Sequence, residues 1–262
     1  MKNFQTKALV LACAAGLSLS GGSALADKIT FVSWGGAYTA SQVKACVEPY
    51  QALTGQEFNI VDYNGGLAEV RTQVEAGNVQ WDIVDMTPQD SLRGCDEGLL
   101  VELDHSMWAP APDGTPATED FVDGALADCH VGNISWATVP AYDKTKVNGT
   151  PTSMADFWDV QKFPGRRGLR KVPRVNLEWA LMADGVANED IYDVLGTKAG
   201  QDRAFAKMDE IKDHVVWWEA GAQPPQLLAD GEVVFTTAYN GRLFNAMYVE
   251  KKPFAIMWGP QV

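Results

Sequence analysis

Strand-like and helix-like segments alternate along the first half of the chain, and this alternation is the feature that most limits its fold. The apolar runs typical of strands occupy residues 29–34, 57–63 and 81–86, with a short strand or extended link at 99–103. The amphipathic segments that separate these runs occupy 39–53 and 66–77. Such alternation is typical of parallel sheets covered by helices, so the sequence predicts an α/β protein.

The second half of the chain continues in the same style. The expected strands lie at 133–139, 214–219 and 232–239, and the expected helices at 175–184, 188–195, 199–213 and 241–250. An apolar stretch follows at 254–258. Residues 70–86 and 224–239 share one plan, in which a helix, a glycine and a strand end in polar or aromatic residues. This similarity indicates two lobes that are built alike, with the polar, turn-rich segment 143–153 as the crossing between them.

The first 26 residues have the pattern of a secretory signal peptide. Lys2 and Lys7 precede an apolar run, and Ala24 and Ala26 fit a cleavage site, so we expect cleavage after Ala26. The alternative, a lipoprotein site at Cys13, has a very short apolar stretch before it. No later stretch reaches the roughly 18 apolar residues that a membrane-spanning helix needs.

The charge of the chain argues against nucleic acid as a partner. There are 34 Asp and Glu residues against 21 Lys and Arg, of which two lie in the signal peptide. Phosphate neutralisation needs a basic face, whereas an acidic exported protein suits free diffusion or a cationic ligand. His105, His130 and His214 are far apart and lack metal-ligand spacing, so we expect no metal and no cofactor.

Three cysteines remain after the signal peptide. Cys46 shares a helical stripe with Val43 and Val47, so it is expected in the core. Cys95 and Cys129 lie near the ends of elements. Because export permits disulfides, we predict a bond between these two.

The residues that follow each strand are the candidates for a binding site, because ligands of open α/β sheets lie beyond the carboxyl ends of the strands. These candidates are Trp34, Gly35, Gly36, Tyr38, Asp85, Thr87, Trp136, Glu219 and Tyr239. In this interpretation Trp34 lines a cleft, and the glycines admit the ligand to the backbone and to a helix N-terminus. The alternative is structural, with a buried indole, a glycine turn, and carboxylates at the surface or in helix caps.

Two further features concern the second lobe. Trp217 and Trp218 are adjacent in a strand, so at most one of them faces the cleft. Residues 166–174, "RRGLRKVPR", hold five basic residues in nine. This segment is interpreted as solvated surface. The alternative is that Arg174 accepts a ligand carboxylate through its planar guanidinium, which would favour an amino-acid-like ligand.

Four segments together resemble the periplasmic solute-binding proteins of ABC importers, in particular the spermidine/putrescine-binding group. They are "FVSWGGAY", "AGNVQWDIVDM", "TSMADFWD" and "ADGEVVFTTAYNGR". The resemblance implies a two-lobed type II periplasmic-binding-protein fold with hinge strands and a ligand held between the lobes by aromatic and acidic side chains. It implies ligand roles for Trp34, Thr87 and Tyr239.

The chain departs from that group in two ways. The stretch "LRKVPRVNLEWAL" carries Lys171 and Arg174 but no acidic residue before Glu178, which weakens the case for a doubly cationic ligand. The group's chains also run longer, so the chain is expected to be C-terminally incomplete. The expected domains are a signal peptide, 1–26, a first lobe, 27–138, with a return segment, 240–262, and a second lobe, 139–239.

The resulting expectation is a monomeric, non-catalytic periplasmic protein that captures a polyamine or related small amine and delivers it to an ABC permease. The first alternative is an amino acid or an ω-amino acid such as 4-aminobutyrate as the ligand. The alternative from another class is a secreted hydrolase that uses cleft carboxylates. Against an enzyme, the sequence has no HExxH and no GxSxG motif.

Overall fold

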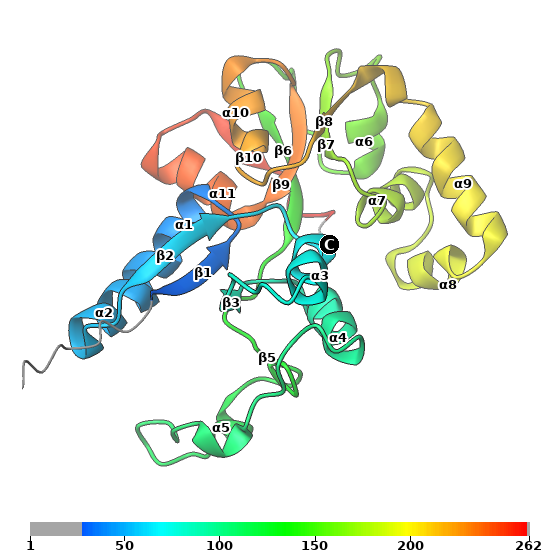
Figure 1. Ribbon diagram of the computed structural model, residues 1–262. Helices are drawn as coiled ribbons and strands as arrows, with labels where there is room; N and C mark the ends of the chain where they lie inside the picture. Colours follow the sequence, from blue (N-terminus) through cyan, green and yellow to red (C-terminus); the bar gives the residue numbers. More distant parts are fainter. Residues whose placement is uncertain (1–27, 261–262) are drawn as a thin grey trace, which may run out of the picture.

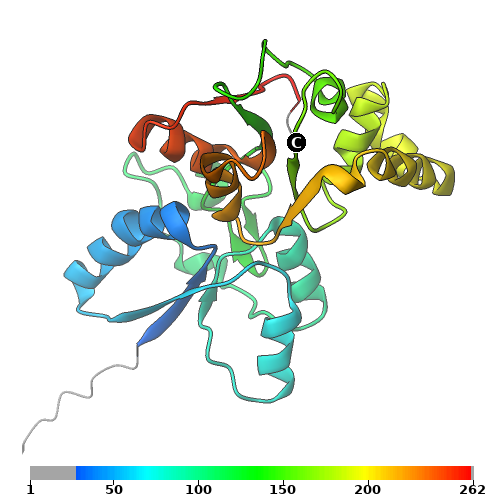
Figure 2. The same cartoon turned by 90° about the horizontal axis from the view of Figure 1, so that it is seen from above.

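The computed structural model describes residues 28–260, which form two larger β-sheets with helices packed on them and a separate antiparallel two-stranded sheet. Figures 1 and 2 show the blue and cyan elements of the first sheet on one side and the green-to-red elements of the second on the other. The expected signal peptide, 1–26, lies outside the described residues. Within 28–260, no helix is long and apolar enough to cross a membrane.

The first sheet has three parallel strands in the order β2-β1-β3. They are β1 (Ile29–Ser33), β2 (Phe58–Asp62) and β3 (Ile83–Val84). The helices that follow these strands are α1 (Gly36–Gln42), the π-helical turn η1 (Val43–Val47), α2 (Glu48–Thr54), α3 (Ala68–Glu75) and α4 (Pro88–Asp96). The predicted strand–helix alternation is therefore confirmed here, and all three strands end at the same edge.

The position of Cys46 corrects the sequence interpretation, because its side chain is exposed. The helix from α1 to α2 is continuous, and its middle turn is π-helical. A π turn holds one residue more than an α turn, so it shifts the buried position from 46 to Val47, which is 6% exposed. The expected core stripe assumed an unbroken α-helical period.

Residues 97–137 lead from the first sheet to the second. The elements in this segment are the 3₁₀ turn η2 (His105–Met107), α5 (Ala117–Asp120), β4 (Leu126–Ala127) and β5 (His130–Val131). No strand forms at 99–103, which is an extended link. The predicted disulfide is confirmed, since Cys95 and Cys129 are bonded with their Cα atoms 5.8 Å apart, and it ties the return of this segment to α4.

The second sheet has five strands in the order β10-β6-β9-β7-β8. They are β6 (Thr138–Asp143), β7 (Arg167–Arg170), β8 (Val215–Trp218), β9 (Phe235–Tyr239) and β10 (Phe254–Ile256). β7 runs parallel to β8 and β9, while β6 runs antiparallel to β9 and β10. β6 begins at 138 instead of the expected 133, because strand partners are present only from that residue on.

Helices cover the second sheet and enclose the main core. They are α6 (Met154–Trp158), α7 (Asn176–Ala183), η3 (Asn188–Asp190), α8 (Ile191–Leu195), α9 (Lys198–Asp209), η4 (Lys212–His214), α10 (Gln223–Asp230), α11 (Asn240–Phe244) and the π turn η5 (Asn245–Val249). Phe157, Trp179 and Phe235 are almost fully buried in this core. This large core explains why the second half of the sequence is rich in apolar residues.

The described part of the segment 240–262 contacts both parts of the molecule. α11 contacts α1 of the first part, and Figure 1 shows the two helices close together. The next element, β10, instead pairs with β6 in the second sheet. The domain limits given above remain predictions, and the structure adds that 254–256 is a strand of the second sheet.

Arg167 corrects the interpretation of residues 166–174 as solvated surface, because it is 0% exposed. Its guanidinium donates to the carbonyl oxygens of Phe157 at 2.8 Å, Gly165 at 2.5 Å and Asp159 at 3.1 Å. Burial lowers the pKa of Arg167 to about 10. Residues 167–170 of the basic segment therefore form β7, a strand that the sequence did not indicate, whereas Arg166 and Lys171 on either side of it are exposed.

Candidate functional site

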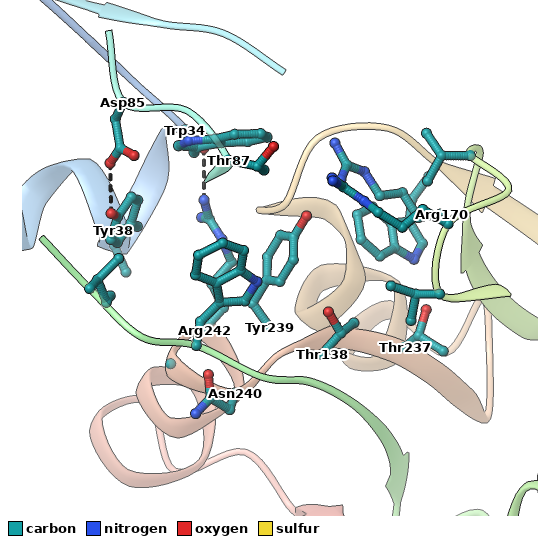
Figure 3. A pocket seen from close by; sticks show the side chains of 18 of the residues that line it. Trp34, Tyr38, Asp85, Thr87, Thr138, Arg170, Thr237, Tyr239, Asn240 and Arg242 are labelled. Carbon is teal, nitrogen blue, oxygen red and sulfur yellow. Dashed lines mark hydrogen bonds between the residues drawn. The ribbon is translucent and has the colours of Figure 1, made fainter. Parts of the chain in front are cut away.

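A cavity of about 600 Å³ lies between the two sheets and is lined from both sides. Its volume falls within the roughly 300–1,000 Å³ typical of small-molecule sites. Figure 3 shows side chains that converge on it from the ends of strands in both sheets. Such a position matches the rule that ligands of α/β sheets lie beyond the carboxyl ends of the strands.

The first sheet contributes a wall made of residues that follow its strands. Trp34 comes directly after β1, and Tyr38 lies in the first turn of α1. Asp85 follows β3, and Thr87 caps α4 by accepting a hydrogen bond from the Asp90 backbone N–H at 3.3 Å. These four side chains line the cavity because parallel strands place their exits at a common edge.

Asp85 is the acidic centre of this wall. Its Oδ2 accepts hydrogen bonds from the Tyr38 hydroxyl at 2.6 Å and from Gln42 Nε2 at 2.5 Å, and the Tyr63 hydroxyl donates to its backbone oxygen. Figure 3 shows the Tyr38 bond. Burial and the Asp85 carboxylate raise the pKa of Tyr38, so the hydroxyl remains a donor. Within residues 28–260, no hydrogen bond uses Asp85 Oδ1, which leaves this oxygen open to a ligand.

Trp34 is held against the turn that follows β2. Its ring lies 5.1 Å from the ring of Tyr63, measured between centroids. A Cβ placed on Gly65 would lie 2.2 Å from the Trp34 ring. Gly65 also has a φ of +86°, so this position requires glycine both for its backbone and for the close approach of the indole.

The Gly65→Ala variant is expected to lower the free energy of unfolding by roughly 2–3 kcal/mol, since left-handed backbone and a steric clash both destabilise it. Gly66→Ala is the matched control, because Gly66 has a φ of +84° with nothing within 4 Å of its added Cβ. It should cost only about 1 kcal/mol. Urea denaturation measures both variants. An equal fall in the free energy of unfolding of the two variants would contradict the close contact between the Trp34 ring and Gly65.

The second sheet contributes a wall of aromatic and basic side chains. Arg170 ends β7, Trp218 ends β8 and Tyr239 ends β9, and all three line the cavity. The Trp218 and Tyr239 rings meet edge to face, 6.0 Å apart between centroids. Trp217 points the other way and is 45% exposed, so only one of the adjacent tryptophans faces the cavity, as expected.

The loop between β7 and α7 adds the rest of this wall. Asn176 Nδ2 donates to the carbonyl oxygens of Arg170 at 2.6 Å and Val172 at 2.7 Å, which closes the loop. Val175 has a φ of +73°, a strained value for a β-branched residue at a cavity wall. Burial raises the pKa of Glu178, while hydrogen bonds from the backbone of Val175 and of Glu178 itself oppose that shift.

Arg242 of α11 lies at the turn that holds Gly35 and Gly36. The ligand role expected for the two glycines remains a prediction. Its Nη2 donates to the Trp34 carbonyl oxygen at 2.7 Å, a bond drawn in Figure 3. A Cβ on Gly36 would lie 3.0 Å from Arg242 Nη1, and the Gly35 backbone N–H donates to Thr39 Oγ1 at 2.7 Å. Neither glycine lines the cavity, because Asp62 lies against Gly35 and Arg242 lies against Gly36.

The rule that ligands lie beyond the carboxyl ends of strands is called the strand-exit rule below. Most of the candidates chosen by this rule lie in the wall of the cavity. Those that line the cavity are Trp34, Tyr38, Asp85, Thr87, Trp136, Tyr239 and Arg174. Glu219 does not line it, because its exposed carboxylate points to Lys171 Nζ at 3.3 Å. Their roles in ligand binding remain predictions.

Arg170 and Arg242 are the charged residues with the most direct contacts to Trp34 among the cavity residues that the sequence interpretation missed. Arg170 would have been a candidate under the same strand-exit rule if 167–170 had been recognised as a strand. Arg242 follows Tyr239 by three residues, within the helix after the strand exit. The sequence gives no signal that it reaches across to the Trp34 backbone.

Comparison with known proteins assigns the chain to a family. Residues 45–262 match the family model of bacterial extracellular solute-binding proteins, and the chain belongs to this family. It is 47% identical over 235 residues to a protein from Pseudomonas aeruginosa named gamma-aminobutyric acid-binding protein, a match that covers 90% of this chain and 64% of that protein. The chain therefore spans about two thirds of the length of this relative.

Solved structures show the same fold. The periplasmic binding protein MotA from Agrobacterium tumefaciens B6, solved with glucopine, matches with a TM-score of 0.79 and 33% identity over 88% of this chain and 69% of that one. Atu4243, titled a GABA receptor, matches with a TM-score of 0.69 and 30% identity over 90% of this chain and 69% of that one. The expected two-lobed type II periplasmic-binding-protein fold is confirmed.

The finer resemblance to the spermidine/putrescine-binding group is not supported. PotD from Streptococcus pneumoniae, a spermidine/putrescine-binding protein, shares 16% identity at a TM-score of 0.58, covering 88% of this chain and 67% of that one. A likeness at that level shows the fold alone. The expectation of a non-enzyme holds at the level of the family, whose members are solute-binding proteins.

Proposed function

We propose that the chain is the periplasmic solute-binding component of an ABC importer, and that its solute is an ω-amino acid such as 4-aminobutyrate. The observation that carries this proposal is a carboxylate on one side of the cavity and two guanidinium groups on the other. Asp85 offers an oxygen without a partner among residues 28–260, and Arg170 and Arg174 lie in the other wall. A zwitterion with separated charges matches this arrangement. The name of the Pseudomonas relative supports the same class of solute.

Aromatic rings would hold the carbon chain of such a solute. Trp34, Trp136 and Tyr239 line the cavity, and burial of methylene groups against rings contributes about 0.8 kcal/mol per group. In this proposal the ammonium group of the solute binds Asp85 and its carboxylate binds the guanidinium groups opposite. Because the solute contacts both walls, it binds the closed arrangement of the lobes better than an open one, and this difference shifts the equilibrium toward closure. The membrane permease would then receive the solute from the closed form.

A diamine fits this cavity less well. It needs a free carboxylate at each end, and the carboxylate available in the second wall is that of Glu178. Backbone N–H groups of Val175 and Glu178 already hydrogen-bond to this side chain, and it is buried. The arginines nearby would repel a second ammonium group. These contacts favour the amino-acid alternative over the polyamine.

The size of the cavity favours a second candidate, a conjugate of an amino acid that is larger than 4-aminobutyrate. About 600 Å³ is far more than a four-carbon amino acid occupies. An N-substituted amino acid, such as a sugar–amino acid conjugate, would fill more of it. The match to MotA, which was solved with glucopine, points in the same direction.

Calorimetric titration of the protein with 4-aminobutyrate tests the proposal. We expect binding by the wild type and about a 10- to 100-fold loss in Asp85→Asn, because a charge-assisted hydrogen bond contributes about 1.5–3 kcal/mol. Glu219→Gln is the matched control, since Glu219 is an exposed carboxylate outside the cavity, and its affinity should stay unchanged. A wild type that binds no amino acid, or an Asp85→Asn variant that binds as tightly as the wild type, would refute the proposal. Chromatography of the recovered solute would show an altered product if the protein were a hydrolase.

A further inference from the structure

Arg170 lies between two indole rings that come from different sheets. Its guanidinium carbon is 5.7 Å from the centroid of Trp34 and 5.9 Å from that of Trp218. Both distances are within the roughly 6 Å at which a cation is attracted to an aromatic face. Figure 3 shows Arg170 reaching into the cavity from the β7 side toward Trp34. The indole of Trp34, which lines the cavity, therefore already has a cation of the protein itself beside its ring.

A second contact fixes this position. Arg170 Nη2 donates to the carbonyl oxygen of Asn64 at 3.1 Å, which lies in the turn after β2. The next residue of the turn is Gly65, against which the outer edge of the Trp34 six-membered ring packs. The same turn thus holds the ring and the guanidinium that faces it. Loss of this contact alone would leave the ring in place, since Gly65 and Tyr63 still support it.

The charge of Arg170 is not neutralised by a nearby carboxylate. None of the salt bridges found between residues 28 and 260 includes Arg170, whereas Lys171, the next residue, pairs with Glu219. An unpaired guanidinium in a partly enclosed cavity repels ammonium groups and attracts anions. Its planar group also stacks on aromatic rings, which a lysine does less well.

We propose that Arg170 determines the ligand class of this cavity by occupying, as a built-in cation, the indole face on which the ammonium group of a diamine would bind. The proposal rests on the solute-binding function proposed above. It explains why the cavity would reject a diamine although aromatic residues follow its strands, as in a cleft that binds amines. It also leaves the Asp85 end of the cavity as the place for a single ammonium group.

Titration of purified variants with putrescine tests this role. Arg170→Met keeps the aliphatic stem but lacks the guanidinium, so it removes the charge and frees the indole face. We expect its putrescine affinity to rise at least about tenfold over that of the wild type, the scale of a cation on a desolvated indole. Arg170→Lys keeps the charge and should reject putrescine as the wild type does. Lys171→Met is the control for net charge, since Lys171 is exposed and lies outside the cavity. Its putrescine affinity should stay unchanged.

The outcomes separate the two proposals. Putrescine binding that appears in Arg170→Met but not in Lys171→Met supports the role of Arg170, even if the wild type binds no 4-aminobutyrate. An Arg170→Met variant that gains no putrescine affinity overturns it, even if 4-aminobutyrate binds as proposed. An equal gain in Lys171→Met also overturns it, because the effect would then come from net charge. Circular dichroism of each variant verifies the fold, and Arg170→Gln provides a second neutral variant with the same expected gain.

Discussion

Replacement of Arg167 with Met is expected to lower the free energy of unfolding by about 4 kcal/mol. Three backbone carbonyl oxygens receive hydrogen bonds from this guanidinium in the core of the second lobe. Met fills a similar volume but donates no hydrogen bond, and each hydrogen bond from a charged donor contributes about 1.5–3 kcal/mol. The Asp159 carbonyl oxygen keeps a second donor, the Phe163 backbone N–H at 3.0 Å, so its loss costs the least of the three. Relief from burying a charge offsets part of this loss. Urea denaturation of both proteins at neutral pH measures the difference.

Arg166→Met is the control for this prediction, since Arg166 precedes Arg167 and has an exposed side chain. Its Nη1 lies 3.7 Å from Glu232 Oε2, and both side chains are more than half exposed. Exposed pairs of this kind contribute about 0–1 kcal/mol. Similar losses in the two variants would contradict the structural role assigned to Arg167.

Removal of the disulfide in a Cys95→Ala, Cys129→Ala double variant is expected to cost about 3–4 kcal/mol. The bond closes a loop between residues 34 positions apart, and loop closure by a disulfide of that length restricts the unfolded chain by about this amount. Reduction of the wild type with dithiothreitol should lower its free energy of unfolding by a similar amount. An intact stability after reduction would show that the bond does not constrain the chain.

Cys46→Ser provides the control for the double variant, because it removes a cysteine without removing the bond. Its side chain is exposed on the π-helical turn, and substitutions at such sites usually change stability by less than about 0.5 kcal/mol. A large loss in Cys46→Ser would instead restore the original interpretation of this residue as part of the core. The comparison therefore tests the effect of the π turn on the helix face.

The parts of the fold that the sequence predicted are those with a local signal. β1, β2, β8 and β9 are apolar runs of β-branched and aromatic residues, and each was expected close to its observed limits. β7 was missed because two of its four residues are arginines. Arg167 is buried only because three carbonyl groups from the preceding segment surround it, and a linear pattern does not reveal such partners.

The candidate site was predictable to the same degree. The rule that strand exits face the ligand placed Trp34, Asp85 and Tyr239 at one cavity although they lie far apart in the sequence. It misplaced Glu219, which also follows a strand but turns toward Lys171 at the surface. The direction of a side chain after a strand depends on the next turn, and the sequence does not fix that direction for each residue.

The choice between a diamine and an amino acid depended on residues outside the recognised motifs. Arg170 and Arg174 lie in the basic segment that was interpreted as surface, yet both line the cavity. Their charge is visible in the sequence, but their position relative to Trp34 becomes visible only when the two sheets face each other. This is why the acidic and aromatic residues alone favoured a polyamine.

A crystal structure of the protein grown with 4-aminobutyrate tests the central claim most directly. We expect the solute in the cavity between the sheets, with its ammonium group within hydrogen-bond distance of Asp85 Oδ1 and its carboxylate beside a guanidinium of the opposite wall. Density for the solute outside this cavity, or contacts from one sheet only, would contradict the claim that the two walls bind it together.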